Sequence, residues 1–144
     1  MREKIHNVLE ERSSRIHETW RALHAMPEPG FEERRTSEYL AERLRQSGYA
    51  VETGLGGTSV VGTLRSQRAG PVLGIRAEMD ALRHEINGKV EVRHSCGHDA
   101  NCAMVTAVAE AIAAVGGIRR GTLKIVFQPA EGMLCGANRN FGRG

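Results

Sequence analysis

The sequence predicts an α/β fold, and three observations lead to this class. Segments with a helical spacing of apolar residues come first, and short runs of β-branched and aliphatic residues follow them. Of the 17 glycines, only Gly30 and Gly48 lie in the first 50 residues. An Ala-rich, strongly apolar segment then stands between two strand-like runs. These features predict two N-terminal helices followed by a mixed sheet and a buried helix.

The first third of the chain contains the two predicted helices. Between residues 4 and 24, apolar side chains recur at spacings of three, four and seven, which is typical of one face of an amphipathic helix. Pro27 and Pro29 end this helix, because proline cannot continue the backbone hydrogen bonds. The second helix is predicted over residues 32–46, with Gly48 just beyond its end.

The middle of the chain predicts strands. Three runs have the composition and length of strands, over residues 49–53, 59–64 and 72–79. The run Val72-Leu73-Gly74-Ile75 has no polar alternation, which predicts a strand buried on both faces. Residues 81–95 are polar and irregular, so we expect a loop there.

A buried helix and a last strand complete the expected order, which is α-α-β-β-β-α-β. Residues 100–115 predict a helix that is packed on nearly all sides, because Glu110 is its only charged residue. We expect Asp99 to cap the N-terminus of this helix. The strand predicted over residues 122–128 leads directly to Glu131.

Composition limits the classes of function. The 144 residues carry a net charge of +3, and the basic residues are dispersed, which argues against a nucleic-acid partner. No apolar run is long enough to span a bilayer and no signal sequence is evident, so we expect a cytoplasmic protein without membrane contact. Three cysteines form an odd set, which argues against a disulfide framework and directs attention to metal affinity or thiol reactivity.

The segment Cys96-Gly97-His98-Asp99 is the most informative one. A cysteine at a helix N-terminus beside imidazoles is expected to have a lowered pKa. A thiolate and an imidazole across one glycine can bind the same transition metal, and Asp99 could orient a ligand. The alternative is a free, half-buried thiol with Asp99 acting only as a cap, since this motif is weak when taken alone.

Two further carboxylates follow predicted strands, where open α/β sheets place their sites. Glu131 stands in an apolar setting, where it could serve as a general base for hydrolysis, and the alternative is a solvated loop residue. Glu78 and Asp80 leave their strand on the same side and could face a shared cation or imidazole. Asp80 is the better candidate, because it stands at the exit of the strand.

Four segments, in this order along the chain, resemble one family. They are residues 24–28 with 31–33, residues 76–82, residues 94–100 and residues 127–131. The resemblance is to the metal-dependent amidohydrolases that include hippurate hydrolase, the N-acyl-amino-acid aminoacylases and the plant auxin-conjugate hydrolases. Four ordered matches are far more specific than any single motif.

The resemblance implies a zinc-peptidase-like catalytic domain. It implies that Cys96 and His98 are metal ligands and that Glu131 is the general base that activates a water. We expect Asp80 and Asp99, from their positions in the sequence, to act as orienting residues. The implied cofactor is a pair of divalent ions, Mn²⁺ or Zn²⁺. The implied reaction is hydrolysis of the amide bond of an N-acyl amino acid or a related amide conjugate.

The chain departs from the family pattern at several positions. Gly132 stands where the family has a second glutamate as a metal ligand, and Asn101, Glu78 and Arg83 replace a histidine, an aspartate and a proline. The family's chains are longer, with an inserted smaller domain and further histidine ligands. We therefore expect residues 1–144 to form a single partial catalytic domain without that inserted domain and the C-terminal part.

Two other readings stay open. The first is a truncated, inactive remnant that acts at most through self-association, by way of an exposed sheet edge at residues 122–128. The second is a metal-independent cysteine hydrolase that uses Cys96 with His98 or His94. It is less favoured, because His98 is only two residues from the thiol.

Overall fold

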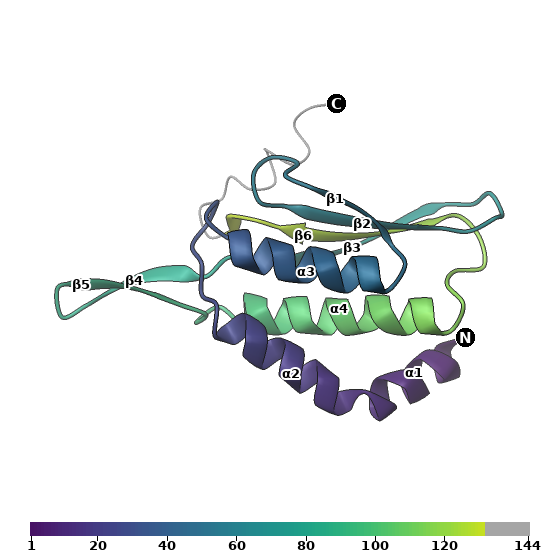
Figure 1. The fold of residues 1–144 in the computed structure, drawn as a ribbon, viewed down its shortest axis with the longest axis horizontal. Coiled ribbons are helices and arrows are strands. Elements are labelled where there is room, and N and C mark those ends of the chain that lie inside the picture. The colour runs from purple at the N-terminus through teal and green to yellow at the C-terminus, as the bar shows by residue number, and fades with distance from the viewer. Residues whose placement is uncertain (132–144) are drawn as a thin grey trace.

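The computed structural model describes residues 1–131, and its elements confirm the predicted α/β class (Figure 1). Three helices open the chain: α1 (Arg2–Glu11), α2 (Ser13–His24) and α3 (Arg34–Gln46). Five strands follow: β1 (Ala50–Thr53), β2 (Val60–Arg65), β3 (Val72–Glu78), β4 (Leu82–Ile86) and β5 (Lys89–Arg93). Helix α4 (His98–Ala114) and strand β6 (Thr122–Gln128) complete the described elements.

Four strands form a mixed sheet in the order β1-β2-β6-β3. The pairs β1-β2 and β2-β6 are antiparallel, and the pair β3-β6 is parallel. Helix α4 lies in the crossover between β3 and β6, as parallel neighbours require a long connection. Because β3 and β6 run in the same direction, their last residues, Glu78 and Gln128, are direct partners. The segments that follow these two strands therefore emerge at one edge of the sheet.

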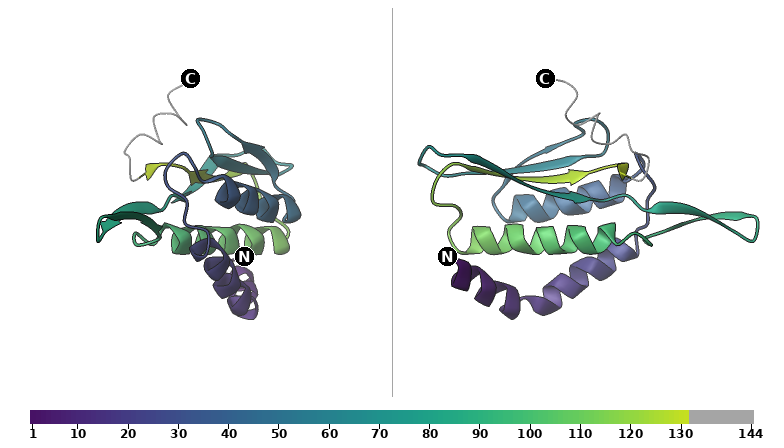
Figure 2. Two further views of the ribbon diagram at one scale, coloured as in Figure 1. Left: turned by 60° about the vertical axis from the view of Figure 1, so that its left-hand side comes forward. Right: turned by 180° about the vertical axis from the view of Figure 1, so that it is seen from behind.

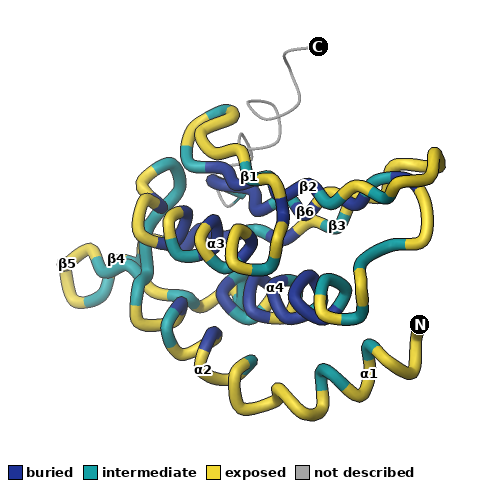
Figure 3. Tube along the Cα trace, turned by 45° about the vertical axis from the view of Figure 1, so that its right-hand side comes forward, coloured by how far each residue is buried: buried dark blue, intermediate teal, exposed yellow. Residues whose placement is uncertain are grey.

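Helices α3 and α4 cover one face of this sheet, and α1 and α2 form a further layer beyond α4 (Figure 2). The core lies between the sheet and the first helix layer, where Leu123, Ile125 and Phe127 alternate along β6 with more exposed residues. Leu40 and Leu44 of α3 belong to the same fully buried cluster. Figure 3 shows this burial concentrated in α3, α4 and the sheet, while α1 has no buried residue. No helix among residues 1–131 is long and apolar enough to cross a membrane.

The single helix predicted over residues 4–24 is two helices. Arg12, with φ −107° and ψ 18°, separates α1 from α2. Both helices contact α4, and the bend at Arg12 lets each of them follow the length of that helix (Figure 1). The apolar spacing is continuous across the break, so it gave no sign of the bend.

The loop expected over residues 81–95 is instead a β-hairpin that extends away from the helices and the main sheet (Figure 1). Strands β4 and β5 pair antiparallel around Asn87 and Gly88, whose φ angles are 52° and 73°. Two positive φ angles in a two-residue connection are the geometry for which Asn-Gly is preferred. The two strands are largely polar, and few other residues cover them. Their sequences therefore lack the buried apolar pattern from which a strand is predicted.

Two expectations about sheet edges were wrong. Residues 122–128 do not form an edge, because β6 has β2 on one side and β3 on the other. Strands β1 and β3 are the two edge strands of this sheet. Val72 and Leu73 of β3 are 67% and 62% exposed, so the run is not buried on both faces. The apolar composition of β3 was read correctly, but no second neighbouring strand covers it within residues 1–131.

Candidate active site

The parallel pairing of β3 and β6 brings the predicted site residues together. Beyond the strands, the amide of Met79 donates to the carbonyl oxygen of Gln128 at 3.0 Å and extends the pairing by one residue. Asp80 and Glu131 therefore leave the same edge of the sheet, opposite the first turn of α4 that carries His98. Sequence positions 80, 98 and 131 meet at the carboxyl ends of the strands, as expected for an open α/β sheet.

Asp80 fixes the orientation of His98. The Nδ1 atom of His98 donates to the Asp80 carboxylate at 3.0 Å and lies 3.1 Å from the Asp80 carbonyl oxygen. The hydrogen bond to the carboxylate, which is 1% exposed, raises the pKa of His98 above its usual value. The bond also assigns the proton to Nδ1 in the neutral ring, so that Nε2 carries the lone pair. Nε2 lies 3.7 Å from Oε2 of Glu131.

Cys96 lies at the exposed rim of this group. Its Sγ atom donates to the carbonyl oxygen of Asp80 at 3.7 Å, so Asp80 contacts both predicted metal ligands. Partial desolvation of the sulfur, together with the nearby charges of Asp80 and Asp99, raises the pKa of the thiol. The expectation of a lowered pKa was wrong, because these effects outweigh the hydrogen bonds from backbone amides at the start of α4.

Asp99 has a different place from the one expected. Gly97, with φ 81°, occupies the N-cap position of α4, and Asp99 lies inside the first turn. Its carboxylate, 2% exposed, accepts a hydrogen bond from Nδ1 of His24 at 2.7 Å. Asp99 therefore connects the end of α2 to the start of α4, and the histidine that it orients is His24 rather than His98.

The sequence suggested that Glu78 and Asp80 could face a shared cation or imidazole. In the structure they form hydrogen bonds with different partners, although the negative charges of both raise the pKa of His98. Glu78 accepts a hydrogen bond from Nη1 of Arg76 at 2.6 Å, and the Nε atom of Arg76 donates to Oε1 of Gln128 at 2.7 Å. The Asp80 carboxylate instead faces His98.

His94 is a histidine whose importance sequence reasoning largely missed. Both of its ring nitrogens are buried, and neither has a hydrogen-bond partner within the described part of the protein. Burial lowers the pKa of His94, which favours the neutral ring, and its centroid lies 6.2 Å from that of His24. Burial of a polar nitrogen without a hydrogen-bond partner costs free energy. The two nitrogens of His94 therefore suit the binding of a ligand or a metal ion.

The donor chemistry at this edge fits a divalent transition metal in part. A thiol, imidazole nitrogens and carboxylates are the groups that Zn²⁺ prefers, and Mn²⁺ accepts the imidazole and carboxylate groups. Within residues 1–131, however, no group of three or more such side chains is arranged to hold one ion. The described residues therefore offer ligands for a metal without completing a site.

The segment over residues 24–33 braces the site from outside. The Glu28 carboxylate accepts from the amide and the hydroxyl of Thr36, at 2.9 and 2.8 Å, and so satisfies donors at the start of α3. The Glu28 carbonyl oxygen accepts from the amide of Ala81 at 2.8 Å, next to Asp80. In the sequence this segment carries only one part of a resemblance. In the structure it connects the start of α3 to the residue that follows Asp80.

Glu33, in the same segment, is fully buried. Its Oε1 atom accepts from the amide of Ala130 at 2.9 Å, and its Oε2 atom accepts a short hydrogen bond from the hydroxyl of Thr58. Burial raises the pKa of Glu33 above its usual value. This residue was not predicted to belong to the site, and it contacts the backbone directly before Glu131.

Comparison of the sequence with known proteins identifies one family. Residues 74–142 match the model of Peptidase family M20/M25/M40. Thermostable carboxypeptidase 1 of Saccharolobus solfataricus is 38% identical over 145 residues, which cover 94% of this chain and 37% of that protein. Hippurate hydrolase of Campylobacter jejuni is 36% identical, over 80% of this chain and 31% of its own length. N-acyl-L-amino acid amidohydrolase of Geobacillus stearothermophilus is 32% identical, over 94% and 38%.

Solved structures agree with these matches. A dinuclear metal-binding peptidase of the M20 family from Bacillus subtilis superimposes with a TM-score of 0.79 and 28% identity, over 90% of this chain and 38% of that chain. A putative aminohydrolase from methicillin-resistant Staphylococcus aureus gives a TM-score of 0.81 and 33% identity, over 90% and 36%. The chain spans about 37% of the length of the first curated relatives, and it matches their N-terminal part.

Proposed function

The chain belongs to Peptidase family M20/M25/M40, and from this premise we propose that it is the N-terminal catalytic segment of a metal-dependent amidohydrolase. The proposed substrates are N-acyl amino acids or related amide conjugates. Relatives named hippurate hydrolase, N-acyl-L-amino acid amidohydrolase and, in Arabidopsis thaliana, IAA-amino acid hydrolase support this class. Cys96 and Cys102 form no disulfide within residues 1–131, which is consistent with a reducing compartment, so we propose a cytoplasmic location.

The observation that carries the proposal is that Cys96 and His98 both contact Asp80 and that Glu131 lies against the other side of the His98 ring. We assign Cys96 and His98 to metal binding, because one presents a thiol and the other an imidazole nitrogen whose ring is held by Asp80. We assign Asp80 and Asp99 to orientation, Asp80 through His98 and Asp99 through His24. Orienting partners of this kind fix the tautomer and direction of a ligand.

Glu131 is assigned the proton transfers. Its carboxylate is 38% exposed and lies 3.7 Å from Nε2 of His98, so it can reach a water at the edge of the sheet. It takes a proton from the attacking water and delivers it to the nitrogen of the leaving amine. Bound divalent ions, Zn²⁺ or Mn²⁺, supply polarisation of the amide carbonyl and acidity to the water.

A second candidate is an inactive remnant. Gly132 has no side chain with which to replace a glutamate ligand, and residues 1–131 contain no arranged set of three ligands. We therefore expect turnover by this chain to be weak or absent even if Cys96 and His98 bind metal. We accordingly propose that residues 1–144 form part of a catalytic domain.

Metal binding is tested by protection of Cys96 against iodoacetamide. Zn²⁺ is expected to slow its alkylation about tenfold or more, since a coordinated thiolate is no longer free to react. Cys102 is 0% exposed and serves as an internal control that stays unlabelled with or without metal. His98→Ala is expected to lose the protection, whereas His17→Ala, on the exposed side of α2, keeps it.

Metal analysis after dialysis and an N-acyl-amino-acid hydrolysis assay then separate the readings. Glu131→Gln is expected to leave Zn²⁺ protection of Cys96 intact and to lower any turnover by about 10²–10⁴-fold. Two bound ions with rapid turnover would exclude the remnant. Hydrolysis that needs no bound metal and is abolished by alkylation of Cys96 would favour the cysteine hydrolase.

The variant Gly132→Glu tests whether the chain lacks a metal ligand at this position. If it does, Gly132→Glu should bind Zn²⁺ more tightly than the parent.

A further inference from the structure

We propose that Glu33 is a positioning residue for Glu131, whose carboxylate holds the peptide group of Ala130 in the conformation that directs Glu131 toward His98. The inference rests on the proposed function of Glu131 as the base. It concerns a buried carboxylate that lies 97 residues away from the backbone amide that it binds.

The conformation of Ala130 is the first reason. Its φ of 51° lies in the left-handed region, which is unfavourable for a residue with a Cβ atom. Ala130 is 0% exposed, so water does not stabilise its amide. A left-handed alanine persists only where its surroundings hold it there, and such residues gather at functional sites. Here the next residue along the chain is Glu131.

The chemistry of Glu33 is the second reason. A carboxylate that is 0% exposed is costly to bury unless its oxygens accept hydrogen bonds. One oxygen accepts from the Ala130 amide and the other from the Thr58 hydroxyl, so the group joins three separate segments of the chain. An apolar side chain would fill the space at lower cost but could not bind that amide. Acceptance of a hydrogen bond from Ala130 is therefore the property that the site requires of this position.

The place of Glu33 in its segment is the third reason. Glu28 and Pro29 already bind Ala81, the residue after Asp80. Residues 28–33 thus contact the exits of both parallel strands, with Glu28 at the exit of β3 and Glu33 at the exit of β6. The segment therefore fixes the ends of the two strands relative to each other. In this way it also fixes the positions of Asp80, which binds His98, and of Glu131.

Amide hydrogen exchange of Ala130, followed by NMR in the full chain, tests the contact directly. In the parent protein this amide is expected to exchange slowly. Glu33→Ala is expected to accelerate exchange at Ala130 about tenfold, the equivalent of one lost hydrogen bond, with little change in β6. Glu33→Gln keeps an oxygen that can accept from Ala130, so it should restore slow exchange. Glu32→Gln, which removes only an exposed ion pair with Arg83, is the matched control.

The positioning role is tested by the distance between Glu131 and His98. A structure of Glu33→Ala should show the Glu131 carboxylate displaced from His98, and Glu33→Gln should retain the contact. Where the parent shows measurable hydrolysis, Glu33→Ala should lower its kcat roughly 10- to 100-fold while KM changes little, because a small misplacement of a reacting group has that effect. Glu33→Gln should stay near the parent.

Fast exchange of the Ala130 amide in the parent protein overturns the inference. This measurement requires no variant, so it remains possible even if Glu33→Ala does not fold. An unchanged Ala130 amide and an unchanged Glu131–His98 distance in Glu33→Ala overturn it as well, as does a Glu33→Gln variant that is as perturbed as Glu33→Ala. Failure of the proposed function has a different signature. Full turnover by Glu131→Gln refutes the role of Glu131 as the base, while the exchange result at Ala130 stands on its own.

Discussion

Three buried carboxyl groups surround the candidate site, and each faces a donor from a distant segment. Glu33 binds the amide of Ala130, Asp80 binds His98, and Asp99 binds His24. At the scale of single residues, negative charge is therefore concentrated in a small, poorly hydrated volume. The consequence is seen in the raised pKa of the Cys96 thiol, to which Asp80 and Asp99 contribute after burial itself.

The same environment predicts a pH dependence of stability at Glu33. Burial raises its pKa from the ordinary 4.5, so the folded protein binds this proton more tightly than the unfolded chain does. The contribution of this tighter proton binding to the free energy of unfolding is fully present below about pH 4.5. It is lost as the pH rises through the pKa of Glu33 in the folded protein. Glu33→Gln has no proton to lose, so its free energy of unfolding should increase relative to the parent as the pH rises across this range.

Urea denaturation of the parent and of Glu33→Gln, from about pH 4 to about pH 8, measures this difference. The difference should grow with pH and then level off above the folded pKa. A difference that shrinks as the pH rises would contradict the raised pKa. Glu32→Gln, whose side chain is 63% exposed, is the surface control.

Sequence reasoning found the residues of the site that stand next to recognisable strand and helix boundaries. Asp80, Cys96 and His98 belong to local motifs, and the structure brings them into contact. Glu33 could not be separated from Glu32, because two adjacent glutamates look alike although one is buried and the other exposed. The unpaired nitrogens of His94 likewise depend on tertiary packing, which no local pattern encodes.

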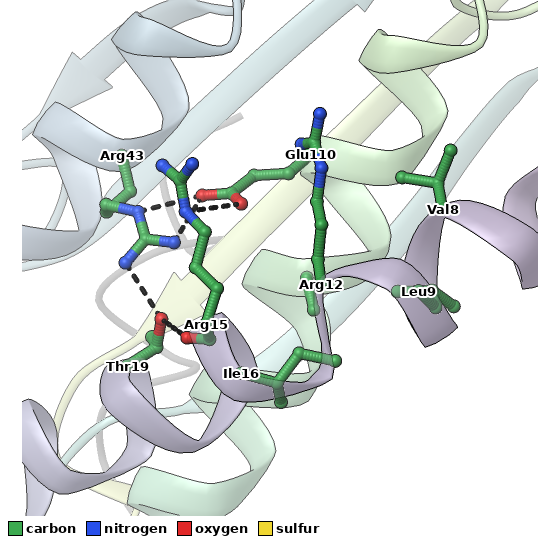
Figure 4. Close-up of a pocket in the computed structure, with 9 residues that line it drawn as sticks. Val8, Leu9, Arg12, Arg15, Ile16, Thr19, Arg43 and Glu110 are labelled. Carbon is green, nitrogen blue, oxygen red and sulfur yellow. Dashed lines mark hydrogen bonds and ion pairs between the residues drawn. The ribbon is translucent and has the colours of Figure 1, made fainter.

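At the scale of elements, Arg43 and Glu110 join three helices. Figure 4 shows the Arg43 guanidinium between Glu110 of α4 and Thr19 of α2. Its Nε atom lies 2.8 Å from Oε1 of Glu110, and its Nη1 atom donates to the hydroxyls of Thr19 and Tyr39 at 2.8 Å. The Arg15 Nε atom approaches the second Glu110 oxygen at 3.6 Å. The Glu110 carboxylate of α4 is thus neutralised where α2, α3 and α4 meet.

Removal of this partner should be costly. The Arg43 and Glu110 side chains are 13% and 7% exposed, so Arg43→Ala leaves a buried carboxylate with only the more distant Arg15. We expect a loss of about 3 kcal/mol in the free energy of unfolding. Arg45→Ala, which breaks a 3.8 Å contact between exposed side chains, should cost under about 1 kcal/mol. Urea denaturation measures the free energy of unfolding of both variants. Equal losses in Arg43→Ala and Arg45→Ala would show that the Arg43–Glu110 pair contributes no more to stability than an exposed ion pair.

The elements themselves were predicted where burial leaves a pattern. The strand over residues 122–128 and the Ala-rich helix agree with β6 and α4 to within one or two residues. The hairpin β4-β5 was missed, because neither of its strands contains a buried residue and exposure along β4 alternates only between intermediate and exposed. Its Asn87-Gly88 turn was the available signal, and it was read as part of a loop.

At the scale of the whole molecule, the sheet is open at β3. Among the described strands β3 pairs only with β6, so the backbone groups along its other side have no strand partner within residues 1–131. Val72 and Leu73 on this strand are among the most exposed apolar residues of the described chain. Sequence analysis expected an exposed edge but assigned it to residues 122–128. That β3 and not β6 is an edge strand follows only from the pairing order, which places β6 between β2 and β3.

This edge predicts self-association of the chain, because an exposed apolar edge strand is a template for pairing with a second copy. Leu73 is 62% exposed, and burying it in a partner should contribute about 1–2 kcal/mol. Leu73→Lys should therefore weaken association roughly tenfold in sedimentation velocity experiments over a range of concentrations. Leu55→Lys is the matched control, since Leu55 is 45% exposed but lies in the turn between β1 and β2. A parent that stays monomeric, or equal effects of the two lysines, would show that β3 is not the contact.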